Sequence, residues 1–445
     1  ILHPGVNTLI PGCLHMVDYP HPSHLLCSFA SSPDLWLRHL ALEHPMCPVD
    51  AVSRLAMVKD SQLRCKALSH RNCAPEVLRE EARSMNTTLR LAVASNPLCP
   101  GDLLEMLTQD PETEIRAAVA ANTAAVPELL RRLSGDNQTA VLSAVAGNPG
   151  TPGEALARLA CSKADAVLES LGTNRACPAA LLNKLADFQQ IGACIAVAGN
   201  PSTPVTVLSR LLERGCGIVH KMEEAFGRTY LHYFSPPVVL LLQRLAANQA
   251  SPPEILEELL SVAGFRVREP VAANPGCPFA ILNELSVATD SKTRRGVAAN
   301  PVSPQELRRK LATDPEPGVR LELARNEHCD PSVVALLARD PEGSVRLAAV
   351  ENEECPQAAV ALLLTDNWHT VRLKALVHRA CTVAMVLDAA SQVCSSAFGR
   401  EVTPILADLA HHPDFPPFLR TMIVHHKGGS SIGYQGLRRP DALCR

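Results

Sequence analysis

Aromatic side chains are scarce in this sequence, and other marks of common protein classes are missing. Phe, Trp and Tyr make up 3% of its 445 residues. Lys and Arg number 42 against 45 Asp and Glu, so the net charge of −3 lacks the basic excess that a general nucleic-acid binder needs. No apolar run reaches the roughly 18 residues of a membrane span, and no signal-peptide pattern opens the chain. We therefore expect a cytoplasmic protein with no membrane partner.

Motifs that carry catalysis or hold cofactors are also missing from the sequence. It contains no phosphate-binding glycine loop, no Gly-x-Ser-x-Gly elbow and no His-Glu-x-x-His helix. It has 16 cysteines but no Cys-x-x-Cys pair. We therefore predict that the protein is not an enzyme, has no catalytic centre and binds no metal or other cofactor.

What the sequence does contain is a 26-residue repeat. In Asn96-Pro97-Leu98-Cys99-Pro100, we define the residue before the second proline as the slot. The slot recurs thirteen times at 26-residue steps, with a single step of 48 residues in the middle. Such strict periodicity predicts a solenoid whose repeats pack only on their neighbours. The slot residues are Cys47, Cys73, Cys99, Ala125, Thr151, Cys177, Thr203, Ser251, Cys277, Ser303, Cys329, Cys355 and Cys381.

Each repeat is predicted to fold as two helices. The first is rich in Ala and Val and ends three residues before the slot, where Asn stands in ten copies and His in three. We expect this Asn, for example Asn122, to end the helix in a left-handed conformation. We expect Thr151 to cap the second helix and Pro152 to occupy its first position. The second helix then carries Leu130 and Leu133 toward the stack.

These patterns resemble the leucine-rich repeat variant family. The matching segments run from Ile115-Arg116 to Asn122 and from Asp314-Pro315 through Val319-Arg320 to Asn326, and the resemblance covers about residues 34–394. It implies a right-handed superhelix in which α- and 3₁₀-helices alternate, with HEAT-type helical pairs as the competing architecture. Some members of the family carry an iron–sulfur domain with closely spaced cysteines, a pattern this chain lacks. The predicted fold is all-α, a right-handed superhelical solenoid of about 13 two-helix repeats (α/α or α/3₁₀) with degenerate end caps.

The domain organisation follows from the quality of the repeat along the chain. We predict a degenerate cap over residues 1–33, seven regular repeats over 34–215 and an irregular aromatic insert over 216–239. Six more regular repeats follow over 240–394, and a cap with a flexible tail over 395–445.

The cysteines are predicted to be structural. Eight of the sixteen occupy the slot, where Thr, Ser and Ala replace them, as a small buried position requires. Stacked helices lie roughly 8–10 Å apart, too far for slot cysteines of neighbouring repeats to form a disulfide. Cys13, His15, His24 and Cys27 could form a zinc site, but packing in an end cap explains them better.

The arginine nine residues before the slot has two interpretations. It is present in nine copies, and the four central copies replace it with Leu142, Leu168, Cys194 and Leu242. The favoured interpretation is a ladder of Arg–Asp pairs that ties repeats together. The alternative is a groove with two basic stripes around an apolar middle, which would suit an acidic partner. The nine are Arg38, Arg64, Arg90, Arg116, Arg268, Arg294, Arg320, Arg346 and Arg372.

The predicted function is a non-catalytic scaffold that binds a protein partner along a curved solenoid surface. The alternatives are an iron–sulfur or zinc-carrying repeat protein, a nucleic-acid-binding helical solenoid and a self-assembling element, so a homo-oligomer is also open. The central insert supplies aromatic anchors typical of interfaces. The predicted partner-binding residues are Phe226, Tyr230, Tyr233, Arg116, Arg268, Arg294 and Arg320.

Overall fold

The computed structural model of the chain describes residues 35–226 and 236–382, together with 26, 27, 30–33, 385 and 389. Every regular element in these residues is a helix, and none of them forms a strand. This confirms the all-α prediction. The described residues up to Val287 form one compact block, and those from Ala288 onward form a second. None of the described helices is both long enough and apolar enough to span a bilayer.

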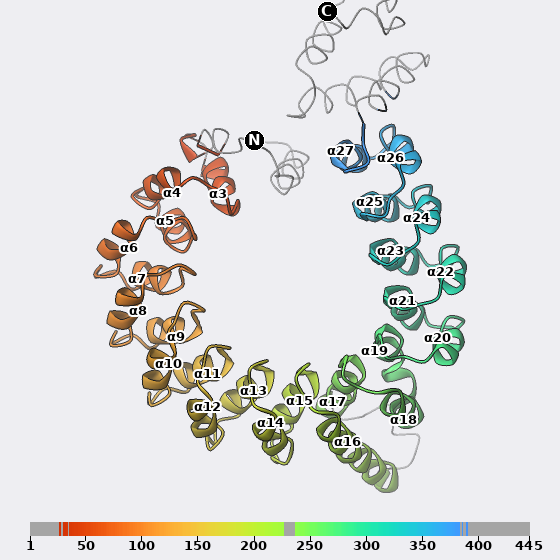
Figure 1. The fold of residues 1–445 in the computed structure, drawn as a ribbon, viewed down its shortest axis with the longest axis horizontal. Helices are drawn as coiled ribbons and strands as arrows, with labels where there is room; N and C mark the ends of the chain where they lie inside the picture. The colour runs from red at the N-terminus through yellow and green to blue at the C-terminus, as the bar shows by residue number, and fades with distance from the viewer. Residues whose placement is uncertain are drawn as a thin grey trace, which may run out of the picture. The chain divides into compact units, whose positions relative to one another are not determined.

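Within each block the helices alternate between an inner row, which carries odd numbers, and an outer row, which carries even numbers (Figure 1). The inner row of the N-terminal block consists of α3 (Leu35–Glu43), α5 (Ser61–Leu68), α7 (Thr87–Ala94), α9 (Thr113–Ala121), α11 (Thr139–Gly147), α13 (Asp165–Thr173), α15 (Ile191–Gly199), α17 (Pro236–Ala247) and α19 (Arg268–Ala273). Its outer row consists of α4 (Val49–Leu55), α6 (Pro75–Glu81), α8 (Gly101–Leu107), α10 (Pro127–Leu133), α12 (Gly153–Leu159), α14 (Ala179–Ala186), α16 (Val205–Phe226), α18 (Pro253–Ala263) and α20 (Phe279–Leu285).

The C-terminal block repeats this arrangement. Its inner row consists of α21 (Ser291–Ala299), α23 (Pro317–Arg325), α25 (Gly343–Glu351) and α27 (His369–Val377), and its outer row of α22 (Gln305–Leu311), α24 (Pro331–Leu337) and α26 (Gln357–Leu363). Both helices of a repeat are α-helices. The one 3₁₀-helix in the described part of the chain is η2 (Gly264–Arg266), so the α/α form of the prediction applies.

Side-chain size explains why the inner row is the tighter one. Consecutive inner-row helices such as α11 and α13, or α13 and α15, pack closely against one another, and outer-row helices do so less. At the closest approach a Cβ on Gly172 would lie 2.7 Å from that of Ala196, so only glycine fits there. The outer row instead directs leucines such as Leu104, Leu130 and Leu156 into the space between the rows, where they are fully buried. Small residues inside and leucines outside therefore curve the stack within a block.

The central irregularity includes one unusually long outer-row helix. Outer-row helix α16 has 22 residues, whereas α10 and α12 have seven each. The insert predicted to begin at residue 216 therefore starts inside a continuing helix. Tyr230 and Tyr233 lie outside the described residues, and so does the side chain of Phe226.

Candidate functional site

The asparagine before each slot joins its repeat to the one before it. Asn148 is 4% exposed, and its Nδ2 donates to the carbonyl oxygens of Ala120 at 2.7 Å and Asn122 at 2.9 Å. Its Oδ1 accepts from the backbone N–H of Gly150 at 2.8 Å. Ala120 lies in the last turn of α9, where carbonyls lack a helical partner. The side chain thus satisfies the helix end of the preceding repeat and the turn of its own.

The same bonds recur along both blocks and form an asparagine ladder. Nδ2 donates to one carbonyl 28 residues earlier and another 26 residues earlier at Asn96, Asn122, Asn174, Asn200, Asn274, Asn326 and Asn352. The prediction that Asn122 ends its helix in a left-handed conformation is wrong. Its φ is −69° and its ψ is 128°, and no described residue other than a glycine has a positive φ. The requirement for Asn is the amide, because both its N–H₂ and its oxygen are used.

The slot residue has a related role. The hydroxyl of Thr151 donates to the carbonyl of Val145 at 2.6 Å, at the end of the inner-row helix before it. It therefore does not cap the second helix, as the sequence suggested. The helix begins at Gly153, with Pro152 immediately before it and no side-chain cap. Thr203, Ser251 and Ser303 make the same bond.

The arginines form the predicted ladder with aspartates of the next repeat. Arg116 donates from Nε and Nη2 to the carboxylate of Asp136, at 2.8 and 3.3 Å, and from Nη1 to the carbonyl of Asp110 at 2.8 Å. Both partners are largely buried, with side chains 15% and 10% exposed. The bond from Arg116 lowers the pKa of Asp136, and the pKa of Asp110 is also lowered, because bonds from Arg90 and a backbone N–H outweigh its burial.

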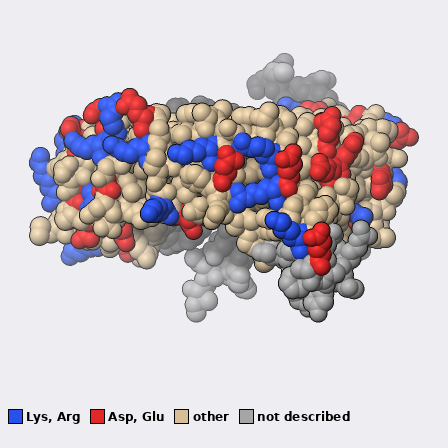
Figure 2. Space-filling view, turned by 90° about the horizontal axis from the view of Figure 1, so that it is seen from below, with Lys and Arg blue, Asp and Glu red and all other residues tan. Residues whose placement is uncertain are grey.

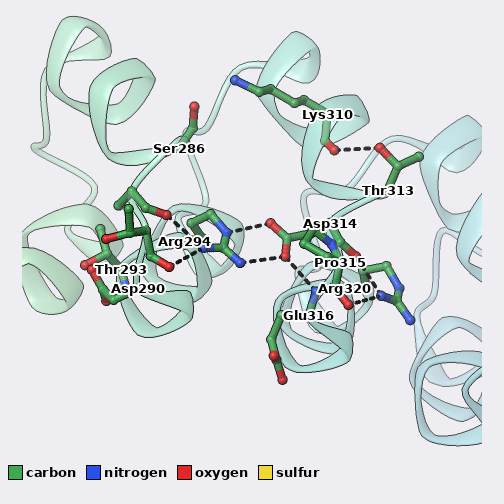
Figure 3. Close-up of polar contacts among 12 residues, drawn as sticks. Ser286, Asp290, Thr293, Arg294, Lys310, Thr313, Asp314, Pro315, Glu316 and Arg320 are labelled. Atoms are coloured by element: carbon green, nitrogen blue, oxygen red, sulfur yellow. Dashed lines mark hydrogen bonds and ion pairs between the residues drawn. The ribbon is translucent and has the colours of Figure 1, made fainter.

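The ladder continues in the C-terminal block (Figure 3). Arg294 donates to both carboxylate oxygens of Asp314, at 2.7 and 3.0 Å, and the carbonyl of Asp314 accepts from Arg320 at 2.6 Å. Arg320 in turn pairs with Asp340 at 2.6 Å. Each aspartate thus links two consecutive arginines, and the chain of bonds extends to Asp366 through Arg346.

In one repeat that lacks the ladder arginine, an arginine at the aspartate position of the ladder takes over its contact. Where Cys194 replaces the ladder arginine, Arg214 stands twenty residues later, at the place that an aspartate occupies in other repeats. Arg214 belongs to the extended helix α16 and donates from Nη1 to the carbonyls of Ala186, at 3.1 Å, and Phe188. Phe188 corresponds to Asp110 in its repeat, so the same carbonyl position receives a guanidinium from the other partner. A search for the ladder's Asp at this offset would have found the exchange.

Three of the four predicted binding arginines are engaged within the protein. Arg116, Arg294 and Arg320 all lie in the ladder. Arg268 is half-buried at the start of α19. The structure brings three of the four into one kind of contact, and their binding of a partner stays a prediction. The same holds for the predicted aromatic anchors, which lie outside what the structure describes.

A second surface, missed by sequence reasoning, lies on the inner row. We define the inner surface as the exposed side of α7, α9, α11, α13 and α15 that faces away from the outer row (Figure 1). It carries mainly Ala, Ser, Gly and Thr, with Leu91 and Ile195 half-buried. Apart from the ladder arginines, the charged side chains exposed on these five helices are Glu114, Asp165 and Glu169. The sequence feature that could have indicated this surface is the run of small residues at the exposed inner-row positions.

Residues 87–112, which include α7 and α8, match the leucine rich repeat variant family. The matched segment is thus similar to one repeat of that family. This confirms the resemblance predicted from the sequence. A solved structure described as a leucine-rich repeat variant with a novel repetitive protein structural motif is 19% identical, covers 50% of this chain and 81% of its own, and has a TM-score of 0.30. No curated protein matches the chain.

The outer row differs from the inner surface in charge. Acidic residues stand in the first turn of several outer-row helices and basic residues in the last, as in α10 and α12, which suits the helix dipole. Arg158, for example, donates to the carbonyl of Arg131 at 2.9 Å in the preceding outer helix. Charges of both signs are accordingly interspersed on the face shown in Figure 2.

The slot cysteines are inert thiols. Those described from Cys47 to Cys355 are buried, and no described cysteine forms a disulfide. Burial raises the pKa of Cys277 and Cys355 to about 11, so both stay protonated near neutral pH. No three His, Cys, Asp or Glu side chains in the described residues lie together as metal ligands would. Of the candidate zinc ligands, Cys27 alone is described.

Proposed function

We propose that the chain is a non-catalytic scaffold that holds a protein partner against the inner surface. The observation that supports this is a surface of mainly small side chains with few charges, on helices whose spacing is fixed by two ladders. Small side chains allow a partner's backbone to approach closely, and a rigid surface loses little entropy when a partner binds.

The chemistry of the inner surface indicates the kind of partner. Because it exposes mainly small and apolar groups, it suits an uncharged, mostly apolar face of a protein, such as one side of an amphipathic helix. Its exposed charges, Glu114, Asp165 and Glu169, are acidic, which disfavours nucleic acid. The ladder arginines have already donated to carboxylates and carbonyls, so the proposal does not depend on them.

A pair of matched substitutions tests the proposal. Ala121 is exposed at the end of α9 on the inner row, and Ala157 is exposed on outer-row helix α12. We expect Ala121→Arg to abolish recovery of the native partner from extract, because the guanidinium would be desolvated at an apolar interface. Ala157→Arg should leave recovery unchanged, and both variants should melt at the wild-type temperature. Equal recovery by the two variants would move the binding site away from the inner surface.

A further inference from the structure

Histidine replaces the ladder asparagine in three repeats, and all three lie at the ends of the described array. His44 and His70 belong to the first two slots, and His378 to the last. His44 and His70 are buried, at 5% and 9% exposure, and His378 is half-buried. The positions between them hold Asn, which does not titrate. We call the contact of each ladder Asn or His with the preceding repeat a joint. The array therefore has titratable joints at its two ends, and joints that do not titrate in between.

The hydrogen bonds at His70 require a neutral ring in one tautomer. Its Nδ1 lies 3.0 Å from the backbone nitrogen of Asn72, which can only donate, so Nδ1 must accept. Its Nε2 lies 3.1 Å from the carbonyl oxygen of His44, which can only accept, so Nε2 must carry the proton. The ring thus reproduces both functions of the asparagine amide.

The same assignment holds at the other end. At His378, Nδ1 accepts from the N–H of Ala380 at 3.1 Å and Nε2 donates to the carbonyl of Asn352 at 3.2 Å. At His44, Nδ1 accepts from the N–H of Met46 at 3.1 Å. All three rings therefore use Nδ1 as an acceptor for the turn of their own repeat.

Protonation is incompatible with this arrangement. A second proton on Nδ1 of His70 would face the N–H of Asn72, so two donors would point at each other in a buried site. The positive ring would also have lost water and would lie near Arg71 and His44. Nε2 could still donate, but relief of the Nδ1 conflict requires the ring to leave, which breaks the bond to the preceding repeat.

We propose that mild acid loosens the end repeats at these histidine joints while the asparagine-joined repeats between them stay closed. This response to pH is separate from binding at the inner surface, and it does not rest on the proposed function.

The pH window follows from the direction of the shifts. Burial lowers the pKa of His70; the bond to the His44 carbonyl opposes this, and Arg71 and His44 add to it. Burial also lowers the pKa of His378, with Arg379 acting in the same direction and Glu353 and the Asn352 carbonyl opposing it. For a histidine with a lowered pKa, the unfolded state binds the proton more readily. Stability is therefore complete above the ordinary value of 6.5 and is lost as pH falls from there to the folded-state pKa.

The two slot thiols next to the N-terminal histidines do not titrate in this window. The thiols of Cys47 and Cys73 have a pKa raised to about 11 by burial, with smaller contributions from Cys27 and Glu81 respectively. They stay neutral throughout mild acid. Acid loosening in this range would therefore report the histidines.

Hydrogen–deuterium exchange of the full chain at about pH 7.5 and about pH 5, corrected for intrinsic exchange, tests the proposal. We expect protection of α3, α4 and α27 to fall, by up to about tenfold for each pH unit passed below the ordinary pKa, while α9 to α13 keep theirs. His44→Asn combined with His70→Asn should remove the loss at α3 and α4 and leave that at α27 as an internal control. Uniform loss along the chain, no loss at the ends, or an unchanged loss at α3 and α4 in the variant would each overturn the proposal.

A second variant keeps the test decisive if the double variant fails to fold. Asn122→His places the titratable joint in the middle of the N-terminal block, between α7 and α9. We expect acid to lower protection there in the variant and not in the wild type. Acid-resistant protection at α7 and α9 of the variant would overturn the proposal.

Discussion

Replacing Asn148 by alanine should destabilise the protein far more than an ordinary surface change. The substitution removes two donated bonds, at 2.7 and 2.9 Å, and one accepted bond at 2.8 Å. It leaves the Ala120 carbonyl and the Gly150 N–H without these partners at a site that is 4% exposed, while the Asn122 carbonyl still accepts from the N–H of Ala125. At about 1 kcal/mol for each net bond, plus a desolvation penalty for the orphaned groups, we expect a loss of about 3–5 kcal/mol.

Urea unfolding followed by helical circular dichroism measures this loss. Asn183→Ala is the matched control, because Asn183 is exposed on α14, and it should change stability by less than about 0.5 kcal/mol. Asn148→His should fall between the two at neutral pH, since the chain itself uses histidine at this position. A repeat array can lose cooperativity when one joint is weakened, so the alanine variant should also show a broader transition.

The reasoning would be refuted by an alanine variant that unfolds within about 0.5 kcal/mol of the wild type. Such a result would mean that water satisfies the two orphaned groups as well as the amide does. It would reduce the ladder to a consequence of stacking rather than a cause of it.

Three further predictions concern the ladder charges and the thiols. Asp340→Ala should cost about 3–5 kcal/mol in urea unfolding because it leaves a buried guanidinium unpaired, whereas Asp102→Ala, in a pair exposed on both sides, should cost less than about 1 kcal/mol. The pKa values of Asp110 and Asp136 are lowered in the folded state, so their contribution should be complete above about pH 3.8 and should disappear as pH falls below it, visible as a drop in the urea midpoint. A thiol reagent at neutral pH should label exposed Cys161 before any described slot cysteine, and faster labelling of a slot cysteine would contradict the assigned burial.

The fold was predictable because a 26-residue period restricts each repeat to two short helices, and the Arg–Asp ladder was predictable because both partners recur at a fixed offset. The role of Asn122 was not. Its partners are backbone carbonyls 26 and 28 residues earlier, and carbonyls leave no trace in the sequence. The sequence showed that the position requires Asn. The end of a helix was the only explanation that neighbouring residues suggested.

The candidate site was harder to predict from the sequence, for a related physical reason. The inner surface consists of residues distinguished by what they lack, and small side chains are also what close packing of α11 and α13 requires. Only the exposure of each position separates the two roles. Aromatic residues drew attention to the middle of the chain, where the structure instead shows α16 continuing to Phe226.

The asparagine ladder also explains how the chain tolerates a repeat of irregular length. Asn248 follows the long outer-row segment, yet its Nδ2 donates to the carbonyls of Ala198 at 2.7 Å and Asn200 at 2.9 Å, 50 and 48 residues earlier. Because the asparagine bonds only to backbone carbonyls of the preceding repeat, the contact does not depend on which side chains that repeat carries or on how many residues lie between the partners. Whole repeats can therefore be gained, lost or lengthened on the outer row without a compensating change across the joint. An array built this way can grow by simple duplication, and its inner surface lengthens by one helix each time.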